Sequence, residues 1–374
     1  MIYALTDFLA DQGGIFSPLR VLNYVSTRSI IAALTTLLLV IFFAPRVIRM
    51  LYLAGQRDSH RDFDEHLAKS KRGTPTMGGV LIIGAMMVSL LLWGDWTNGY
   101  MWAVTSALLV FGFLGAVDDV AKVRGGSAEA GLSRRAKLVI QTLYGLVLGA
   151  LLFLPNTTPF PLEIADTIGI PFLKPEEFGG LNVHLSFFYV VFVAFVVVAV
   201  SNAVNLIDGL DGLAAGTTML PVAVYGVFAY ILGHASLSGY FLYSFQPGVH
   251  ELVVFTAALI GALIGFLWFN GYPAQVFMGD TGSLALGGTL AVLIVLTKQE
   301  LLFLIAGGVF LYVNATHVIG DRIGINMLGR RIFYRTPIHH AYEHLGIAET
   351  KVVLRFWIIS LLLALVAVAT LKLR

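Results

Sequence analysis

Met101-Trp-Ala-Val-Thr-Ser-Ala-Leu-Leu-Val-Phe-Gly-Phe-Leu-Gly-Ala-Val117 is an apolar stretch that ends in two adjacent carboxylates, Asp118 and Asp119. A membrane-spanning helix needs roughly 20 apolar residues, so this stretch matches one span. Two carboxylates at the edge of a membrane are costly to desolvate, and such residues usually mark a site that handles ions or substrate. The stretch therefore predicts a spanning helix with a functional site at its end.

The composition indicates that the whole chain is built in this way. Of the 374 residues, 57% are hydrophobic and 12% are charged, and the mean hydropathy is +0.83. Soluble domains typically carry about 25% charged residues, so we expect a polytopic, all-α integral membrane protein. The chain has no cysteine, which excludes disulfides and cysteine zinc sites. No basic segment precedes an apolar one near the N-terminus, so we expect no signal peptide.

Ten apolar segments are predicted to be spans, and we treat residues 1–374 as one membrane domain. The ninth segment is interrupted by Asn314, His317, Gly320 and Asp321, which predicts a broken helix. The predicted spans cover residues 27–50, 77–94, 100–118, 136–154, 186–206, 213–233, 251–269, 283–298, 301–320 and 352–372.

The basic residues predict the orientation of these spans. Most of the 24 Lys and Arg residues fall in the segments 46–72, 122–137 and 322–355. Cytoplasmic loops carry an excess of Lys and Arg, so we expect these segments to be cytoplasmic and both termini to be periplasmic. Asp118-Asp119 and two further acidic clusters fall on this same face, which predicts a cation shared between them.

The further clusters also lie at the ends of apolar segments. Asn202-Ala-Val-Asn205-Leu-Ile-Asp208-Gly-Leu-Asp211 has a polar residue at every third position, which in a helix forms one polar stripe. The alternative is a loop in which Asp211 caps the next helix. Phe277-Met-Gly-Asp280-Thr-Gly precedes another span, where a helix N-terminus favours phosphate and a divalent cation could separate that phosphate from Asp280. The alternative is Asp280 as a plain N-cap.

The Asp118-Asp119 pair has two interpretations as well. Successive helix residues point about 100° apart, so we expect Asp118 and Asp119 to face different partners. One would face a metal or a reacting group, and the other would face Lys122 or a backbone donor. Lys122 follows Asp118 by four residues, on the same helix face. The alternative is a solvated helix end with an ion pair.

His339 and His340 lie in a basic segment that also holds Arg330, Arg331 and Arg335. No His-Glu-x-x-His motif is present, so contact with phosphate is favoured over zinc binding. Carboxylates, Lys and His at a boundary between water and lipid can neutralise a phosphoryl group and prepare its nucleophile. These residues predict phosphoryl transfer from a water-soluble donor to a lipid phosphate, without identifying either substrate.

The same residues resemble the phospho-N-acetylmuramoyl-pentapeptide transferase family, within the polyprenyl-phosphate N-acetylhexosamine-1-phosphate transferase superfamily. The resemblance extends from about Lys71 to Arg374. The motifs that carry it are Pro75-Thr-Met-Gly-Gly79, Val117-Asp-Asp119, Asn202 to Asp211, Gly265-Phe-Leu-Trp-Phe-Asn270, Tyr272-Pro-Ala-Gln-Val-Phe-Met-Gly-Asp280, Pro337-Ile-His-His340 and Arg355-Phe-Trp-Ile-Ile-Ser360.

The resemblance implies a reaction and a location. The phosphate of undecaprenyl phosphate would attack the β-phosphate of UDP-MurNAc-pentapeptide in a Mg²⁺-dependent step that releases UMP and forms lipid I, for peptidoglycan synthesis. The family implies a homodimer in the bacterial inner membrane, with its active site on the cytoplasmic face. Its fold is a ten-helix bundle with a broken ninth helix and a hydrophobic groove for the lipid. No nucleic-acid partner is expected.

The resemblance also implies roles for individual residues. Asp280 matches the family's metal ligand, and Asp118 matches the base that deprotonates the lipid phosphate. Asp119 matches the residue that assists Asp118 near the metal and the phosphates. The resemblance implies that the uridine is contacted by Lys122, Asp211, Asn270 and Phe277, and that Asp208 makes a polar contact in the active site. It also implies that phosphate or other parts of the substrate are contacted by Lys71, Asn205, His339 and His340. The chain departs from the family at three positions: Ile207 replaces the usual Thr, Thr281 the usual Val, and Ala341 the usual His.

Two other functions stay open at this point. A sister transferase that uses UDP-GlcNAc would share the acidic motifs, although the segments 75–79 and 337–340 favour the muramoyl-pentapeptide enzyme. An ion-coupled transporter would also carry intramembrane carboxylates, but transporter sites lie near the midplane between repeated halves. Here the acids gather at one face and no repeat is evident, whereas a purely structural protein would leave them unexplained.

Overall fold

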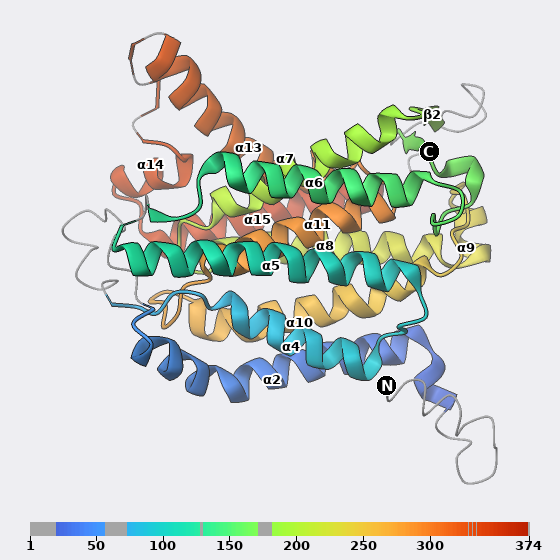
Figure 1. Cartoon of the computed structure of the whole chain (residues 1–374), viewed down its shortest axis with the longest axis horizontal. Coiled ribbons are helices and arrows are strands. Elements are labelled where there is room, and N and C mark those ends of the chain that lie inside the picture. The colour runs from blue at the N-terminus through green and yellow to red at the C-terminus, as the bar shows by residue number, and fades with distance from the viewer. Residues whose placement is uncertain are drawn as a thin grey trace.

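The computed structural model describes residues 20–56, 73–127, 130–170, 182–327, 329–330, 332–333 and 335–372, which form a helical bundle with a small hairpin (Figure 1). The long helices are α2 (Val25–Leu53), α4 (Gly79–Trp93), α5 (Gly99–Gly125), α6 (Arg134–Phe153), α7 (Phe188–Ile207), α8 (Leu213–Leu232), α10 (Leu252–Asn270), α11 (Gly279–Leu296) and α15 (Glu349–Ala369). The shorter elements are η3 (Leu162–Ile164), β1 (Thr167–Gly169), β2 (Asn182–His184), α9 (Ala235–Tyr240), η4 (Val249–Glu251), α12 (Phe303–Ala306), α13 (Gly308–Val318), the π-helical η5 (Ile319–Met327) and α14 (Ile338–His344). Strands β1 and β2 pair antiparallel, with Ile168 opposite Val183.

In the part of the chain that the structure describes, eight helices are long and apolar enough to cross a membrane. They support the prediction of a polytopic, all-α membrane protein. The other two predicted spans differ, because α4 has only 15 residues and the ninth is divided at Gly307 into α12 and a second part, α13 followed directly by η5. The predicted location of the termini stays a prediction, since residues 1–19 and 373–374 lie outside the described part.

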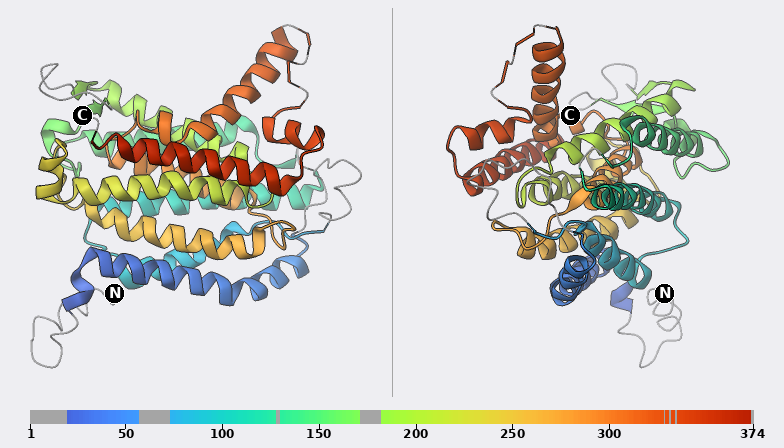
Figure 2. Two further views of the ribbon diagram at one scale, coloured as in Figure 1. Left: turned by 180° about the vertical axis from the view of Figure 1, so that it is seen from behind. Right: turned by 60° about the vertical axis from the view of Figure 1, so that its left-hand side comes forward.

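Helix α11 forms the centre of the bundle and is almost entirely buried. It packs against α5, α7, α4 and α8, while α2 and α15 lie at the periphery (Figures 1 and 2). The peripheral helices expose large apolar side chains, among them Phe42 and Leu362. Lipid tails can cover such side chains, whereas the backbone of every helix must satisfy its own hydrogen bonds inside a bilayer.

Two glycines allow the backbones around α11 to approach it closely. A Cβ placed on Gly115 of α5 would lie 2.0 Å from the carbonyl oxygen of Asp280. A Cβ on Gly79 of α4 would lie 2.2 Å from the backbone nitrogen of Gly282. Small residues at helix contacts are typical of membrane proteins, where packing takes over from the hydrophobic effect in holding helices together. This contact brings the end of α5 to the beginning of α11.

The end of the bundle near α9 and the hairpin is held by buried charges. The Arg28 guanidinium of α2 donates to both carboxylate oxygens of Glu251, at 2.7 and 2.8 Å. Lys298, directly after α11, donates to the Ala165 carbonyl at 2.8 Å, and its Nζ lies 3.8 Å from the centre of the Tyr189 ring. Burial lowers the pKa of Lys298 to about 7, because desolvation disfavours the ammonium form.

The ninth predicted segment is divided. Helix α12 ends at Ala306, Gly307 separates it from α13, and η5 continues from Ile319. Adjacent glycines at 307 and 308 weaken the helix there, because glycine costs about 1 kcal/mol relative to alanine inside a helix. Together α13 and η5 project from the bundle above α14 (Figures 1 and 2).

Candidate active site

Three carboxylates converge where α5 ends and α11 begins. Asp118, Asp119 and Asp280 each offer an oxygen atom, and these atoms lie within 4.8 Å of one another. Asp118 and Asp119 are almost fully buried, with exposed fractions of 0% and 4%. We call these three residues the carboxylate cluster. It lies at the α14 end of the bundle, opposite the hairpin and α9 (Figure 1).

Asp119 holds the N-terminus of α11. Its Oδ1 accepts a hydrogen bond from the Asp280 backbone nitrogen at 3.0 Å, and its Oδ2 accepts from the Thr281 nitrogen at 2.9 Å and the Thr281 hydroxyl at 2.7 Å. The first turn of a helix has unpaired N–H groups and a positive end of the dipole, both of which a carboxylate satisfies. Asp119 therefore acts as a cap supplied by another helix and sets the position of Asp280.

Asp118 and Asp280 share two lysines. Lys122 Nζ lies 2.7 Å from Asp118 Oδ2 and 3.0 Å from Asp280 Oδ2. Lys137 Nζ lies 2.7 and 2.8 Å from the same two oxygens. Both ammonium groups thus bridge the two carboxylates, and buried carboxylates need such partners.

Lys137 was not predicted as a site residue. It lies in the first turn of α6, after Ser133, whose hydroxyl caps that helix by accepting from the Ala136 nitrogen at 3.2 Å. A cation in a first helical turn opposes the helix dipole, and this is a sequence signal that could have identified it. The loop between α5 and α6 brings it to the cluster, because Leu132 donates its backbone N–H to Asp118 Oδ1 at 2.7 Å.

The polar stripe of α7 reaches the cluster through Asn205. Asn205 donates to Asp280 Oδ1 at 3.1 Å and to the Ser283 hydroxyl at 2.8 Å. Asn202 instead donates to Gln141 Oε1 of α6 at 2.7 Å. Asp208 is the residue at which α7 ends. The stripe is therefore divided between the site and the contact of α7 with α6.

Asp211 and Asn270 connect two loops, residues 208–212 between α7 and α8 and residues 271–278 between α10 and α11. Asn270 accepts from the Gly212 nitrogen at 3.0 Å and donates to the Val276 carbonyl at 2.9 Å. Asp211 Oδ2 accepts from the Ala274 nitrogen at 3.0 Å. A further residue that was not predicted, Glu349 of α15, accepts from the Asp211 nitrogen at 2.8 Å.

The Pro75–Gly79 motif lies against the second of these loops. Phe277 donates its backbone N–H to the Pro75 carbonyl at 2.8 Å, and Gly78 donates to the Phe277 carbonyl at 2.8 Å. These backbone bonds divert residues 73–78 from helical geometry and explain why α4 begins later than the predicted span. The Phe277 side chain is buried, with 3% exposed. Lys71 lies outside the described residues.

His339 and His340 lie beside the 208–212 loop. A Cβ placed on Gly209 would lie 2.3 Å from His339 Nε2 and 3.0 Å from His340 Nε2. His339 is fully buried, and the Nδ1 of His340 lies 2.9 Å from Glu343 Oε2. Helix α14 thus places both imidazoles next to the loop that follows Asn205.

The carboxylate cluster fits a hard divalent cation. Its donors are carboxylate oxygens, which Mg²⁺ and Ca²⁺ prefer. Its three carboxylates exceed the two bridging lysines, so the group of five side chains retains a net negative charge. A bound phosphate can pair with the two lysines in place of Asp280, whose carboxylate is then free to ligate a cation. The arrangement can therefore hold a metal and phosphate groups together.

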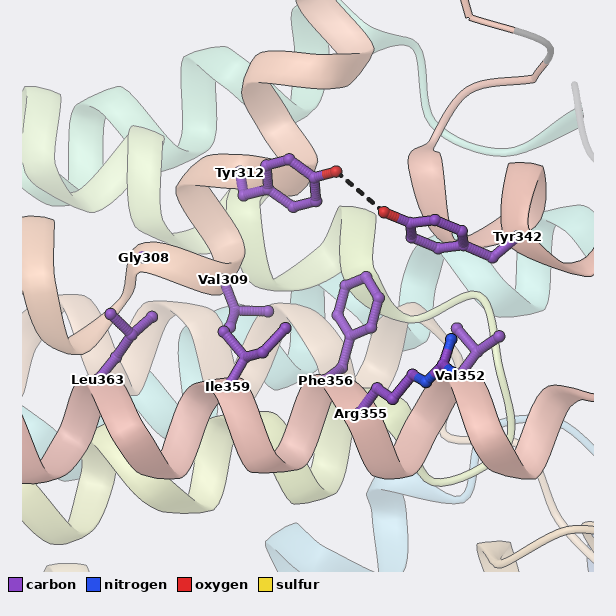
Figure 3. Close-up of a pocket in the computed structure, with 9 residues that line it drawn as sticks. All are labelled: Gly308, Val309, Tyr312, Tyr342, Val352, Arg355, Phe356, Ile359 and Leu363. Atoms are coloured by element: carbon purple, nitrogen blue, oxygen red, sulfur yellow. Dashed lines mark hydrogen bonds between the residues drawn. The ribbon is translucent and has the colours of Figure 1, made fainter. Parts of the chain in front are cut away.

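A groove of about 510 Å³ opens between α13 and α15. Its apolar part is formed mainly by α15, and Figure 3 shows Tyr312 and Tyr342 hydrogen-bonded at 3.2 Å above that helix. Arg355 lies on the same side as Tyr342, away from Leu363 at the other end (Figure 3). The lining residues are Gly308, Val309, Tyr312, Tyr342, Val352, Arg355, Phe356, Ile359 and Leu363. Such a shape matches an amphiphile with an anionic head and an apolar tail.

The fold and site define a class of membrane enzyme, and comparison with known proteins agrees. Residues 101–298, more than half of the chain, match the model of Glycosyl transferase family 4. The matched segment contains the complete carboxylate cluster. The chain therefore belongs to this family of transferases.

Closer relatives narrow the assignment. Residues 71–83 match Phospho-N-acetylmuramoyl-pentapeptide-transferase signature 1. A Phospho-N-acetylmuramoyl-pentapeptide-transferase from Solidesulfovibrio magneticus is 46% identical over 100% of both chains. Proteins of the same name from Oleidesulfovibrio alaskensis and Maridesulfovibrio salexigens are 43% and 42% identical, over 99% and 100% of this chain and 100% of their own. The chain belongs to the phospho-N-acetylmuramoyl-pentapeptide-transferase family.

Proposed function

We propose that this protein transfers phospho-MurNAc-pentapeptide from UDP-MurNAc-pentapeptide to undecaprenyl phosphate, with release of UMP and formation of lipid I. The observation that carries the proposal is the carboxylate cluster with its two bridging lysines, in a chain whose full-length relatives bear the name of this transferase. An oxygen of the lipid phosphate attacks the β-phosphorus of the donor, and the bond from that phosphorus to the oxygen of UMP breaks.

The cluster residues divide the work between them. Lys122 and Lys137 neutralise the phosphate oxygens, since each presents an ammonium between two carboxylates. Asp118 takes the proton of the lipid phosphate, once the lysines have moved to the incoming phosphates. Asp119 holds the N-terminus of α11 and thereby orients Asp280. Asp280 ligates Mg²⁺, which supplies charge neutralisation at the transferred phosphate when bound.

The donor lies between the two connected loops and α14. Asp211, Asn270 and Phe277 surround the uridine, and the hydrogen bonds of Asp211 and Asn270 give those loops a fixed shape before binding. Asp208 and Asn205 contribute polar contacts near the diphosphate. The two imidazoles of α14 and Lys71 contact phosphate or the sugar-peptide portion.

The acceptor lies in the groove between α13 and α15. Its apolar lining suits a polyprenyl chain, while Arg355 and the two tyrosine hydroxyls give the groove a polar end. The groove holds part of the tail, and the rest extends into the lipid. The active site faces the cytoplasm, because Lys122, Arg124 and Lys137 lie where α5 ends and α6 begins, and cytoplasmic segments carry an excess of Lys and Arg. We also propose that the protein works as a homodimer.

A two-donor assay tests the reaction. Purified protein is incubated with undecaprenyl phosphate and either UDP-MurNAc-pentapeptide or UDP-GlcNAc, with and without Mg²⁺. We expect UMP and lipid I from the first donor only, and only with Mg²⁺. Lipid-linked GlcNAc-phosphate without lipid I would assign the protein to the sister transferases. Transport of an ion without UMP release would favour the transporter.

A substitution in the groove tests the acceptor site. Ile359→Trp fills part of the groove and is expected to raise the KM for undecaprenyl phosphate about tenfold, as overpacking costs about 1–3 kcal/mol and 1.4 kcal/mol is a factor of ten. The KM for the nucleotide donor should stay within about twofold. Ile358→Trp is the matched control, because Ile358 is equally exposed, at 49%, but does not line the groove. Equal effects of the two substitutions would remove the groove from the acceptor site.

A further inference from the structure

We infer that Glu343 is a positioning residue that holds the His340 imidazole with its Nε2 toward the 208–212 loop. The inference rests on the proposed function, in which His340 contacts the substrate. Both residues belong to α14, and His340 Nδ1 lies 2.9 Å from Glu343 Oε2. A carboxylate only accepts hydrogen bonds, so Nδ1 must carry the proton in this contact.

This contact selects which nitrogen can meet a ligand. With Nδ1 engaged, Nε2 is the nitrogen left for substrate, as an acceptor when the ring is neutral and as a donor when it is protonated. The distance of 3.0 Å between His340 Nε2 and a Cβ on Gly209 places this nitrogen beside the 208–212 loop. Four residues before Gly209, Asn205 donates its Nδ2 hydrogen to Asp280 Oδ1 at 3.1 Å. The pair of Glu343 and His340 therefore lies beside the loop that follows Asn205, a residue bonded to the carboxylate cluster.

Helix stability alone does not explain the position of Glu343. Its side chain is 12% exposed, and a carboxylate so deeply placed is costly unless it is paired. It lies in the last turn of α14, where the negative end of the helix dipole opposes it. If Glu343 positions the His340 ring, this explains why its carboxylate is buried and why it is tolerated at the negative end of the helix dipole.

The other titratable or charged groups around α14 have different partners. Arg335, which precedes the helix, lies 2.6 Å from His344 Nε2, and Tyr342 is bonded to Tyr312 of α13. From α15, Glu349 accepts from the Asp211 backbone nitrogen. His339 of the same helix is directed at Gly209. The His339 ring lies against that of His340, with ring centres 4.5 Å apart, and the Glu343 carboxylate is the group on α14 that bonds His340 Nδ1.

A double-mutant cycle tests the inference in the full-length protein. UMP release is measured for the wild type, E343Q, E343L, H340A and H340A/E343L, with kcat and KM for UDP-MurNAc-pentapeptide. We expect E343L to lower kcat/KM roughly 10-fold to 100-fold, the range for losing one hydrogen bond to a charged group. E343Q keeps a carbonyl acceptor for Nδ1–H and should stay within about threefold of the wild type.

The decisive result is the behaviour in the H340A background. If Glu343 acts through His340, E343L should cause no further loss once the imidazole is absent. A purely structural role for Glu343 would give the same loss with and without His340, and would overturn the inference, as would an unchanged E343L. Wild-type protein that releases no UMP from this donor would instead overturn the proposed function. Thermal unfolding of each variant, with E343Q as the isosteric reference, identifies any loss due to misfolding.

Discussion

Asp280→Asn is expected to lower Mg²⁺-dependent UMP release by about 1,000-fold or more while leaving the bundle folded. Asp280 Oδ2 pairs with both Lys122 and Lys137, and Oδ1 accepts from Asn205. Asparagine has the same shape but lacks the charge, so it neither ligates a divalent cation well nor pairs with the lysines. Removing one preorganised electrostatic group typically costs 10²–10³ in rate, and here the metal ligand is lost as well.

The measurement combines turnover with a readout of metal binding. Binding of Mn²⁺, followed by electron paramagnetic resonance, should weaken in Asp280→Asn, and the unfolding temperature should change little. Asp95→Asn is the matched control, since Asp95 lies at the other end of α4 and its Oδ1 accepts from the Thr97 nitrogen at 2.9 Å. Full turnover and unaltered Mn²⁺ binding in Asp280→Asn would remove its assigned role.

Gly115→Ala is expected to disrupt both the bundle and the site. The new methyl group would lie 2.0 Å from the Asp280 carbonyl oxygen and 2.6 Å from Thr281 Cα, distances at which backbone atoms must move. Overpacking a core costs about 1–3 kcal/mol, so we expect the unfolding temperature of a chain of this length to fall by about 1–4 °C. Moving α5 away from α11 also separates Asp118 from Asp280, and a misplacement of about 1 Å can cost about 100-fold in rate.

Gly84→Ala provides the matched control for this substitution. Gly84 lies in α4, and a Cβ placed on it would meet no atom within 4 Å. Alanine is the better helix former, so the unfolding temperature and the turnover should be unchanged or slightly higher. If Gly115→Ala behaves like Gly84→Ala, α5 does not contact α11 as closely as described.

Local patterns in the sequence predicted the helices and much of the site composition. Apolar length identifies a span because every backbone group in lipid must bond within its own helix. The prediction for residues 77–94 was too long, since the Pro75–Gly79 backbone bonds to Phe277 instead of continuing the helix. Asn314, His317, Gly320 and Asp321 predicted an interrupted ninth segment, but α13 continues through Asn314 and His317, and the break lies earlier, at Gly307.

The different partners of Asp118 and Asp119 show which contacts of the site can be predicted from the sequence and which cannot. Their 100° separation on a helix predicted different partners, and Asp118 faces Lys122 while Asp119 faces backbone donors. The two carboxylates nevertheless converge with Asp280, with oxygen atoms within 4.8 Å of one another. Those donors belong to α11, more than 150 residues away along the chain. Nothing near Asp119 in the sequence indicates that it caps another helix.

The sequence by itself determined most of the long helices, that they belong in a membrane, and which acidic residues lie at their ends. These properties depend on hydropathy, charge and spacing within single segments. Only the tertiary structure shows that Lys137 and Thr281 contact the carboxylate cluster and that Asp119 supports α11. It also shows that Glu343 contacts His340 and Glu349 contacts Asp211. Each of these depends on how closely two helices approach, as α5 and α11 do at Gly115, and that distance is set by packing between segments.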